Sequence, residues 1–189
     1  MTTIGITGGI GSGKSYISML LRQMAVPVYD CDTEAKRLTA SNPDIRAALK
    51  ALVGNDVYNG EALVKERLAA YLFANADNAA RVNAIIHPAV LRDFKEWAVR
   101  QQSPVVAMES AILYESGFDK HVDKVLLVDA PEDVRLQRAM QRDGASEAQI
   151  RARMQQQQHG RHHADYVIQN HNQSDAQLVA SLRQQLGLH

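Results

Sequence analysis

The chain has few of the features that mark exported, membrane-bound or nucleic-acid-binding proteins. Its 189 residues include a single cysteine, so no internal disulfide framework can form. No stretch resembles a secretory leader or a membrane span. Lys and Arg total 21 and Asp and Glu also total 21, so no net positive field attracts nucleic acid or an anionic membrane. These absences favour a cytoplasmic protein with a small-molecule partner and neither a nucleic-acid nor a membrane partner.

The length of the chain limits the number of domains. A chain of 189 residues can bury one sizeable core with a small inserted element, but it is short for two full domains. We therefore expect a single α/β domain. Cys31 lies between Asp30 and Asp32, whose negative charges disfavour a thiolate, so we interpret it as a small packing residue.

A glycine-rich loop, "GGIGSGKS", lies near the start of the sequence. The spacing Gly8-x4-Gly13-Lys14-Ser15 fits the phosphate-binding loop (P-loop) pattern, in which a strand leads through a loop into a helix. The segments on both sides fit this strand–loop–helix pattern. "MTTIGIT" predicts a short buried strand, and the apolar positions of "SYISMLLRQM" recur at helical spacing. The motif therefore occurs in the setting that its function requires.

The residue types of this loop suit a polyphosphate. Glycines allow backbone N–H groups to approach the phosphates, and the positive end of the following helix adds to the field. Lys14 supplies a charge for the β- and γ-phosphate oxygens, and Ser15 offers a hydroxyl ligand to Mg²⁺. The expected nucleotide-binding residues are Gly8, Gly9, Ile10, Gly11, Ser12, Gly13, Lys14 and Ser15.

Apolar runs predict four further strands. They cover residues 26–30, 104–110, 122–130 and 164–170, and with the first strand they indicate a five-stranded parallel sheet buried on both faces. Residues 33–100 form a long helical tract, broken at Gly54 and Gly60, which we expect to be a helical subdomain that holds a phosphate acceptor.

Several helix boundaries can be predicted from capping residues. Asn42-Pro43 suits a cap and first turn, and Pro131 and Gly144 bound a later helix. Ser146 with Gln149 and Ser174 with Gln177 have the spacing of capping boxes. His87-Pro88 is expected to interrupt the long tract, with Pro88 in a first helical turn.

Two aspartates follow the second strand, at the edge of a parallel sheet where ligands gather. Phosphoryl transfer to a hydroxyl needs a carboxylate that orients the acceptor and takes its proton, and Asp30 or Asp32 could serve. Asp is also a preferred helix N-cap, and a helix is expected to begin near Thr33. Position in the sequence does not separate these two readings.

Other residues are candidates for a functional or a structural role. Glu109 ends a strand and could reach a Mg²⁺ shell. His87 could flank Pro88 or contact an anionic acceptor. The "HGRHH" segment, residues 159–163, is expected to be solvated and not to bind a metal. Trp97 is expected to be a packing residue. The arginines could stabilise a transferring phosphoryl group or form a solvated basic face; they are Arg135, Arg138, Arg142, Arg151, Arg153 and Arg161.

Taken in order, these motifs resemble the dephospho-CoA kinase family over nearly the whole chain. The resemblance rests on "GITGGIGSGKS", "VYDCD", "IIHPAV", "LVDAPEDVRLQRAMQRD" and "ADYVIQN". It implies a P-loop kinase core with a helical acceptor-binding subdomain (33–100) and a lid (roughly 138–163). It also implies ATP-dependent phosphorylation of the ribose 3′-hydroxyl of dephospho-CoA, the last step of coenzyme A synthesis.

The resemblance also assigns roles to individual residues. Asp32 matches the family's proposed catalytic base, and His87 matches a histidine in its acceptor region. Lys36 stands near the position where the family often has an arginine, which makes it a candidate substrate contact. Arg138 and Arg142 match basic lid positions, and Asp165 and Asn170 fall in a segment that lies toward the nucleotide. Lys14, Asp32, Arg138 and Arg142 are thus the expected catalytic residues.

Two other kinds of P-loop protein make different predictions for the sequence. A GTPase switch should carry D-x-x-G and N/T-K-x-D motifs, and the sequence has neither. Another small-molecule kinase would share the loop and lid chemistry, so only acceptor screening separates it. A monomer or a weak homo-oligomer is expected.

Overall fold

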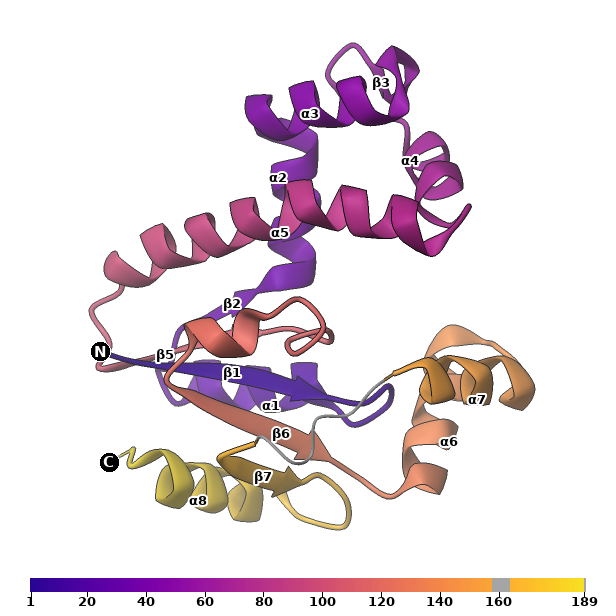
Figure 1. Ribbon diagram of the computed structural model, residues 1–189. Coiled ribbons are helices and arrows are strands. Elements are labelled where there is room, and N and C mark those ends of the chain that lie inside the picture. The colour runs from indigo at the N-terminus through magenta and orange to yellow at the C-terminus, as the bar shows by residue number, and fades with distance from the viewer. Residues whose placement is uncertain (158–163, 189) are drawn as a thin grey trace. The chain divides into compact units, whose positions relative to one another are not determined.

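The computed structural model describes residues 1–157 and 164–188, and its internal contacts divide them into two units (Figure 1). One unit comprises Met1–Tyr29 and Gln101–His189, and the other comprises Asp30–Arg100. The sheet belongs to the first unit, and the second is mainly helical. The predicted helical tract, 33–100, has nearly the bounds of the second unit, while its role in holding an acceptor stays a prediction.

A five-stranded sheet forms the centre of the first unit, in the strand order β2-β5-β1-β6-β7. The registers Ile6↔Glu109, Gly8↔Val128 and Asp129↔Gln169 fix the parallel pairing of β1 with β5, β1 with β6 and β6 with β7. The predicted parallel sheet is confirmed. Its strands are β1 (Thr2–Gly8), β2 (Val28–Asp30), β5 (Val105–Glu109), β6 (Lys124–Asp129) and β7 (Tyr166–Gln169).

Two helices cover one face of this sheet: α1 (Lys14–Gln23) and α8 (Asp175–Leu186). Alternate strand residues point into this layer, and the helices contribute their apolar stripes. Each fully buried aliphatic side chain stabilises the fold by about 1.5–3 kcal/mol, so this layer anchors the loop between β1 and α1. The core comprises Ile4, Ile6, Ile17, Leu20, Leu21, Val26, Val105, Ala107, Leu126, Val128, Ile168, Leu178 and Leu182.

Asp165 lies at the amino edge of the sheet, opposite the glycine loop. Its carboxylate accepts hydrogen bonds from Lys124 Nζ at 2.9 Å and from the backbone N–H of Val125 at 2.8 Å, where β6 begins. The glycine loop follows Gly8, which pairs with Val128 at the other end of β6. The expectation that Asp165 lies toward the nucleotide is therefore wrong, because the parallel register places the start of β7 away from the loop.

The ion pair at Asp165 should make stability depend on pH. The hydrogen bond from Lys124, with that from Val125, holds the pKa of Asp165 below its ordinary value of 3.8. The unfolded chain therefore binds the proton more readily, so this stabilisation is present above about pH 4 and is lost as the pH falls through the lowered value. We expect Asp165→Asn to lower Tm at pH 7 by about 2–4 °C, and the difference from the parent chain to shrink on acidification.

Thermal unfolding followed by circular dichroism between neutral and acidic pH measures this effect. Asp133→Asn is the matched control, because Asp133 is exposed on the surface of a helix and should give a smaller change at every pH. A Tm difference for Asp165→Asn that stays constant with pH would contradict the linkage.

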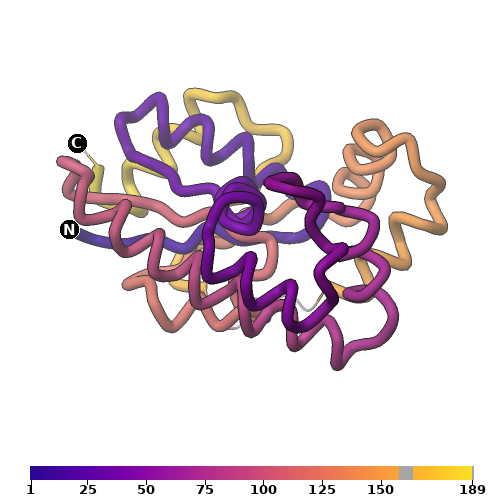
Figure 2. The backbone as a smooth tube through the Cα atoms, turned by 90° about the horizontal axis from the view of Figure 1, so that it is seen from above, coloured from indigo at the N-terminus to yellow at the C-terminus, as the bar shows by residue number. Residues whose placement is uncertain are grey.

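Two helices after β6, α6 (Glu132–Asp143) and α7 (Glu147–Gln156), lie side by side (Figure 2). Leu136, Ala139, Ile150 and Met154 form a small core between them. The capping box of Ser146 and Gln149 is confirmed, as is that of Ser174 and Gln177 at α8. Arg161 and the histidines of "HGRHH" lie outside the described residues, and the lid over 138–163 stays a prediction.

The second unit is built from four helices and a short hairpin among its residues Asp30–Arg100. Asn42 caps α3 as predicted: its side chain accepts from the backbone N–H groups of Asp44 and Ile45, and Pro43 follows. The elements are α2 (Cys31–Ser41), α3 (Pro43–Val53), the 3-10 turn η1 (Asn55–Val57), β3 (Tyr58–Asn59), β4 (Ala62–Leu63), α4 (Lys65–Leu72) and α5 (Ala76–Val99). A second 3-10 turn, η2 (Phe118–His121), belongs to the first unit.

Two predictions for this unit are wrong. Pro88 does not interrupt the helical tract but lies inside α5, because buried residues such as Val82, Val90 and Phe94 keep helical spacing on both sides of it. The antiparallel β3–β4 hairpin was not predicted, and Gly60 was taken only as a helix break. The two-residue turn is Gly60-Glu61, between the paired Asn59 and Ala62, and a glycine at the first turn position is a known hairpin signal that was available in the sequence.

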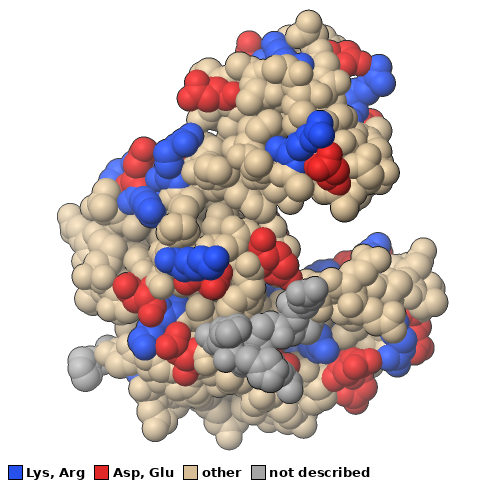
Figure 3. Space-filling model, viewed as in Figure 1, with Lys and Arg blue, Asp and Glu red and all other residues tan. Residues whose placement is uncertain are grey.

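The surface shows no large field of one sign on the face drawn in Figure 3, where Lys and Arg side chains alternate with Asp and Glu side chains. Within the described residues, no helix has both the length and the apolar character that a membrane crossing requires.

Candidate active site

The glycine loop folds around its own lysine. Lys14 Nζ donates a hydrogen bond to the backbone oxygen of Gly8 at 2.8 Å. Gly13 is the N-cap of α1 and has no side chain that could cap the helix. No side chain caps the first turn of α1, and the positive end of the helix dipole favours an anion there.

Glycine is required at two positions of the loop by both conformation and space. Gly11 has φ +76° and Gly13 has φ +90°, in the left-handed region. A Cβ atom at Gly11 would lie 2.1 Å from the backbone oxygen of Arg135, and one at Gly13 would lie 2.1 Å from Asn170 Nδ2. The loop is thus packed directly against α6 and against the end of β7.

Ser15 and Glu109 meet at the carboxyl edge of the sheet. Ser15 Oγ donates a hydrogen bond to Glu109 Oε1 at 2.8 Å, although the two residues are 94 positions apart. Glu109 ends β5, which pairs with β1, and it is buried. The sequence offered Glu109 as a possible Mg²⁺ neighbour, and the strand register brings its carboxylate to the hydroxyl that was predicted as the metal ligand.

Asn170 joins three elements around the loop. Its Nδ2 donates to the backbone oxygen of Ser12 at 2.8 Å, and its backbone N–H donates to the oxygen of Asp129 at 2.7 Å. Its own backbone oxygen accepts a hydrogen bond from Arg138 Nη1 at 2.9 Å. Asn170 is buried, so its side chain braces the loop while its backbone oxygen holds Arg138 beside it.

Arg142, Arg151 and Arg153 have acidic partners. Arg142 donates to both carboxylate oxygens of Asp143, at 2.7 and 3.1 Å, and Arg153 binds the same carboxylate at 3.2 Å. Arg151 binds Glu132 and Glu147. Of the two expected lid arginines, Arg138 is therefore beside the glycine loop, whereas Arg142 is held by an exposed ion pair that costs little to exchange.

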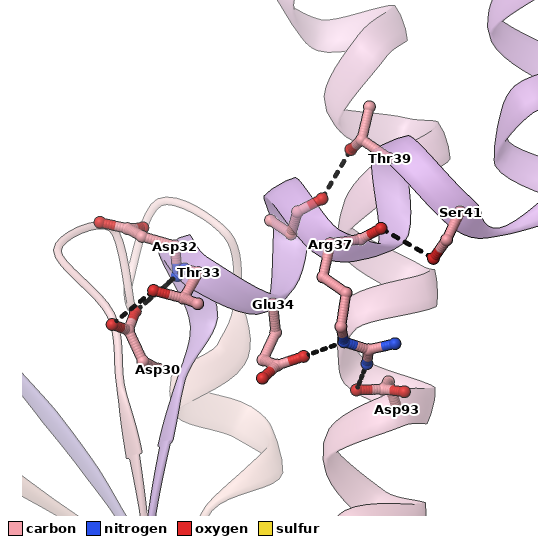
Figure 4. Close-up of polar contacts among 9 residues, drawn as sticks. Asp30, Asp32, Thr33, Glu34, Arg37, Thr39, Ser41 and Asp93 are labelled. Atoms are coloured by element: carbon pink, nitrogen blue, oxygen red, sulfur yellow. Dashed lines mark hydrogen bonds and ion pairs between the residues drawn. The ribbon is translucent and has the colours of Figure 1, made fainter. Parts of the chain in front are cut away.

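The two aspartates after β2 differ in what they bind. The Asp30 carboxylate accepts from the backbone N–H groups of Asp32 and Thr33, at 3.0 and 3.1 Å, so Asp30 is the N-cap of α2. In Figure 4 the carboxylate of Asp32 carries no dashed line to any of the residues drawn, whereas that of Asp30 is joined to Thr33. Asp30 is therefore the helix cap, and Asp32 is available to contact an acceptor. Helix α2 begins at Cys31, earlier than the expected start near Thr33.

The remaining acceptor candidates belong to the second unit. Asp32 and Lys36 lie one turn apart on α2 and line the same cavity, which also includes Ile86 of α5. His87, the next residue, is half-buried, and burial lowers the pKa of its imidazole, which favours the neutral form near pH 7. Sequence reasoning missed Lys65, another residue of this cavity, because nothing in its local pattern distinguishes it from a surface lysine.

No group of three or more His, Cys, Asp and Glu side chains able to hold a metal was found in residues 1–157 and 164–188. Mg²⁺ at a phosphate site does not need such a cluster, since it is commonly held by one or two protein oxygens together with substrate phosphates. Trp97 stacks on Phe94 with ring centroids 6.1 Å apart, which agrees with a packing role.

Comparison with known proteins agrees with this arrangement. The family model described as CoaE, dephospho-CoA kinase, matches residues 2–176. A protein of Porphyromonas gingivalis named dephospho-CoA kinase is 50% identical over 154 residues, which are 82% of this chain and 76% of that protein. The crystal structure of TT1252 from Thermus thermophilus has a TM-score of 0.84 and 32% identity, over 98% of this chain and 95% of that one.

A second solved structure supports the fold. Dephospho-CoA kinase from Campylobacter jejuni has a TM-score of 0.71 at 20% identity, covering 97% of this chain and 96% of that one. The family model spans far more than half of the sequence, and the glycine loop with its Ser15–Glu109 contact lies inside the match. This chain therefore belongs to the dephospho-CoA kinase family.

Proposed function

We propose that this chain transfers the γ-phosphoryl group of ATP to the ribose 3′-hydroxyl of dephospho-CoA and so forms coenzyme A. The acceptor oxygen forms a bond to the γ-phosphorus, the bond from that phosphorus to the β–γ bridging oxygen breaks, and ADP leaves. The observation that carries the proposal is the P-loop with its buried Glu109 partner, in a chain that matches this kinase family over residues 2–176.

The glycine loop binds the triphosphate in this proposal. Backbone N–H groups of the loop and of the start of α1 hydrogen-bond the phosphates, which lie at the positive end of the helix dipole. Lys14 exchanges its bond to the Gly8 oxygen for phosphate oxygens and neutralises charge on them. Because these groups are fixed before the nucleotide binds, little reorganisation is needed at the moment of transfer.

The donor set at Ser15 and Glu109 fits Mg²⁺, because a hydroxyl and a carboxylate oxygen 2.8 Å apart are hard ligands that this ion accepts, either directly or through water. When bound, Mg²⁺ would neutralise charge that develops on the β- and γ-phosphates. The Glu109 carboxylate, held by its place at the end of β5, keeps the Ser15 hydroxyl oriented toward the loop.

Asp32 orients the acceptor hydroxyl and takes its proton, a role that the family resemblance assigns and that its uncommitted carboxylate supports. Lys36 and His87 contact the acceptor. Arg138 stabilises the charge of the transferring group, and Arg142 exchanges Asp143 for phosphate oxygens when the lid closes and excludes water. We further propose a cytoplasmic protein that is a monomer or a weak homo-oligomer.

The test is to incubate the purified protein with Mg²⁺ and ATP together with dephospho-CoA, beside AMP, CMP and pantothenate. ADP release and the mass of the acceptor are followed together. A gain of one phosphate on dephospho-CoA alone is expected. Phosphate on a different acceptor would identify another small-molecule kinase, and ADP release without a phosphorylated acceptor would overturn the proposal.

The brace at Asn170 gives a prediction about nucleotide binding. Asn170→Ala removes the donor to the buried Ser12 oxygen, so the loop loses this support, while the backbone oxygen that binds Arg138 remains. We expect KM for ATP to rise by about tenfold, the effect of losing a buried hydrogen bond that positions the loop. KM for the acceptor should change little.

Steady-state kinetics with each substrate varied in turn measure the effect, and Gln169→Ala is the matched control. Gln169 is the preceding residue and is exposed, and its side chain makes only a long contact of 3.4 Å to Asp129. If Asn170→Ala lowers Tm but leaves KM for ATP at the parent value, Asn170 has a structural role only.

A further inference from the structure

A cavity of about 580 Å³ opens inside the second unit. Its size lies within the usual range for small-ligand sites. The wall combines aliphatic side chains with three charged ones, which is the lining expected where an amphipathic ligand binds. The lining residues are Asp32, Ala35, Lys36, Thr39, Ala40, Leu63, Lys65, Leu68 and Ile86.

One wall of this cavity is a single face of α2. Asp32, Lys36 and Ala40 follow one another at intervals of four residues, so they form a row along the helix. At 1.5 Å per residue the row is about 12 Å long, with Asp32 at the first turn and Lys36 about 6 Å further on. Chemical functions are therefore ordered along the wall: a carboxylate, then an ammonium group, then an apolar end.

The α4 part of the lining adds a second ammonium group. Lys65 is the first residue of α4, where Leu68 also faces the cavity. Neither Lys36 nor Lys65 has an acidic partner among the described residues, whereas Arg37 binds Glu34 and Asp93, and Arg67 binds Asp56. These arginines of the unit thus have acidic partners, whereas the cavity lining carries two lysines and a single carboxylate, that of Asp32, and this excess of positive charge favours an anionic ligand.

The position of Lys65 is unfavourable for the helix that contains it. A cation in the first turn of a helix opposes the helix dipole, and α4 has no side-chain cap at its start. Helix stability therefore does not explain a lysine at this position. An anion that binds beside both Lys65 and the uncapped N–H groups of α4 does explain it.

We infer that this cavity binds the diphosphate and the adjoining arm of the acceptor, and that Lys65 is a specificity-determining residue that the reaction requires for an acceptor with a phosphate bridge. The inference rests on the proposed function for the identity of the acceptor. The ribose hydroxyl lies at the Asp32 end, the diphosphate lies between Lys36 and Lys65, and the arm lies along Leu63, Leu68 and Ile86. A nucleoside without the diphosphate lacks the group that the lysines hold.

The test compares Lys65→Gln with the parent chain. Removing the charge should raise KM for dephospho-CoA by about tenfold, the size of one lost charge-assisted hydrogen bond, with KM for ATP unchanged. Calorimetric binding of dephospho-CoA with ADP saturating should weaken in parallel. Tm of the free protein should stay the same or rise, because the substitution relieves the unfavourable charge at the start of α4.

Lys95→Gln is the control, since Lys95 is an exposed lysine of the same unit that does not line the cavity. If Lys65→Gln leaves both KM and calorimetric affinity for dephospho-CoA at parent values, the inference is wrong. An equal rise in KM for ATP would also overturn it, because the effect would then not belong to the acceptor. A parent chain that does not phosphorylate dephospho-CoA would instead refute the proposed function, so the two failures are distinguishable.

Discussion

Asp32→Asn should lower kcat by about 10²–10⁴-fold, the range typical of removing a general base, while the affinity for ATP persists. The amide has nearly the shape of the carboxylate but cannot take the proton of the acceptor hydroxyl. The Asp32 side chain carries no dashed line to the other residues drawn in Figure 4, so folding should be unaffected. Single-turnover kinetics and calorimetry with ADP separate the chemical step from nucleotide binding.

Asp30→Asn is the matched control, because it makes the same chemical change two residues earlier. Asn is as good an N-cap as Asp, so α2 keeps its cap and turnover should stay near that of the parent chain. Asp30→Ala should instead cost about 1 kcal/mol of stability through loss of the cap. If Asp32→Asn kept the kcat of the parent chain, or if Asp30→Asn showed the large fall in kcat instead, the assignment of the base to Asp32 would be wrong.

The outcome at these two aspartates illustrates what the sequence could predict. The glycine loop, the five strands and the caps at Asn42, Ser146 and Ser174 depend on neighbours within a few residues, and such local rules were sufficient. The sequence also placed both aspartates at the end of a strand. It could not say which was the cap, because that depends on whether α2 begins at Cys31 or two residues later.

The missed β3–β4 hairpin had a local signal, whereas the error at Pro88 came from long-range packing. Pro88 stays in α5 because apolar residues on both sides of it, such as Val82 and Phe94, are buried against the rest of their unit. The Ser15–Glu109 and Ser12–Asn170 bonds join residues 94 and 158 positions apart, so they depend on strand order. That order follows from the whole sheet and not from any local pattern.

The second large effect is expected at Gly11. Gly11→Ala places a Cβ atom 2.1 Å from the backbone oxygen of Arg135, and a backbone atom of a helix cannot rotate away as a side chain can. The loop or α6 must move, and a displacement of about 1 Å at a catalytic site can cost 10²-fold in rate. We therefore expect kcat/KM for ATP to fall by about 10²-fold or more, together with weaker ADP binding in calorimetry.

Gly117→Ala separates this clash from backbone strain. Gly117 has φ +72°, close to the +76° of Gly11, but a Cβ atom there meets nothing within 4 Å. Both substitutions force alanine into the left-handed region, at a cost of about 1–2 kcal/mol, and should lower Tm. Only the substitution at Gly11 should also weaken nucleotide binding, because the loop must approach both the phosphates and α6 at that residue. Parent-like ADP affinity in Gly11→Ala would show that the loop adapts, and the packing of Gly11 against α6 would then be unimportant for binding.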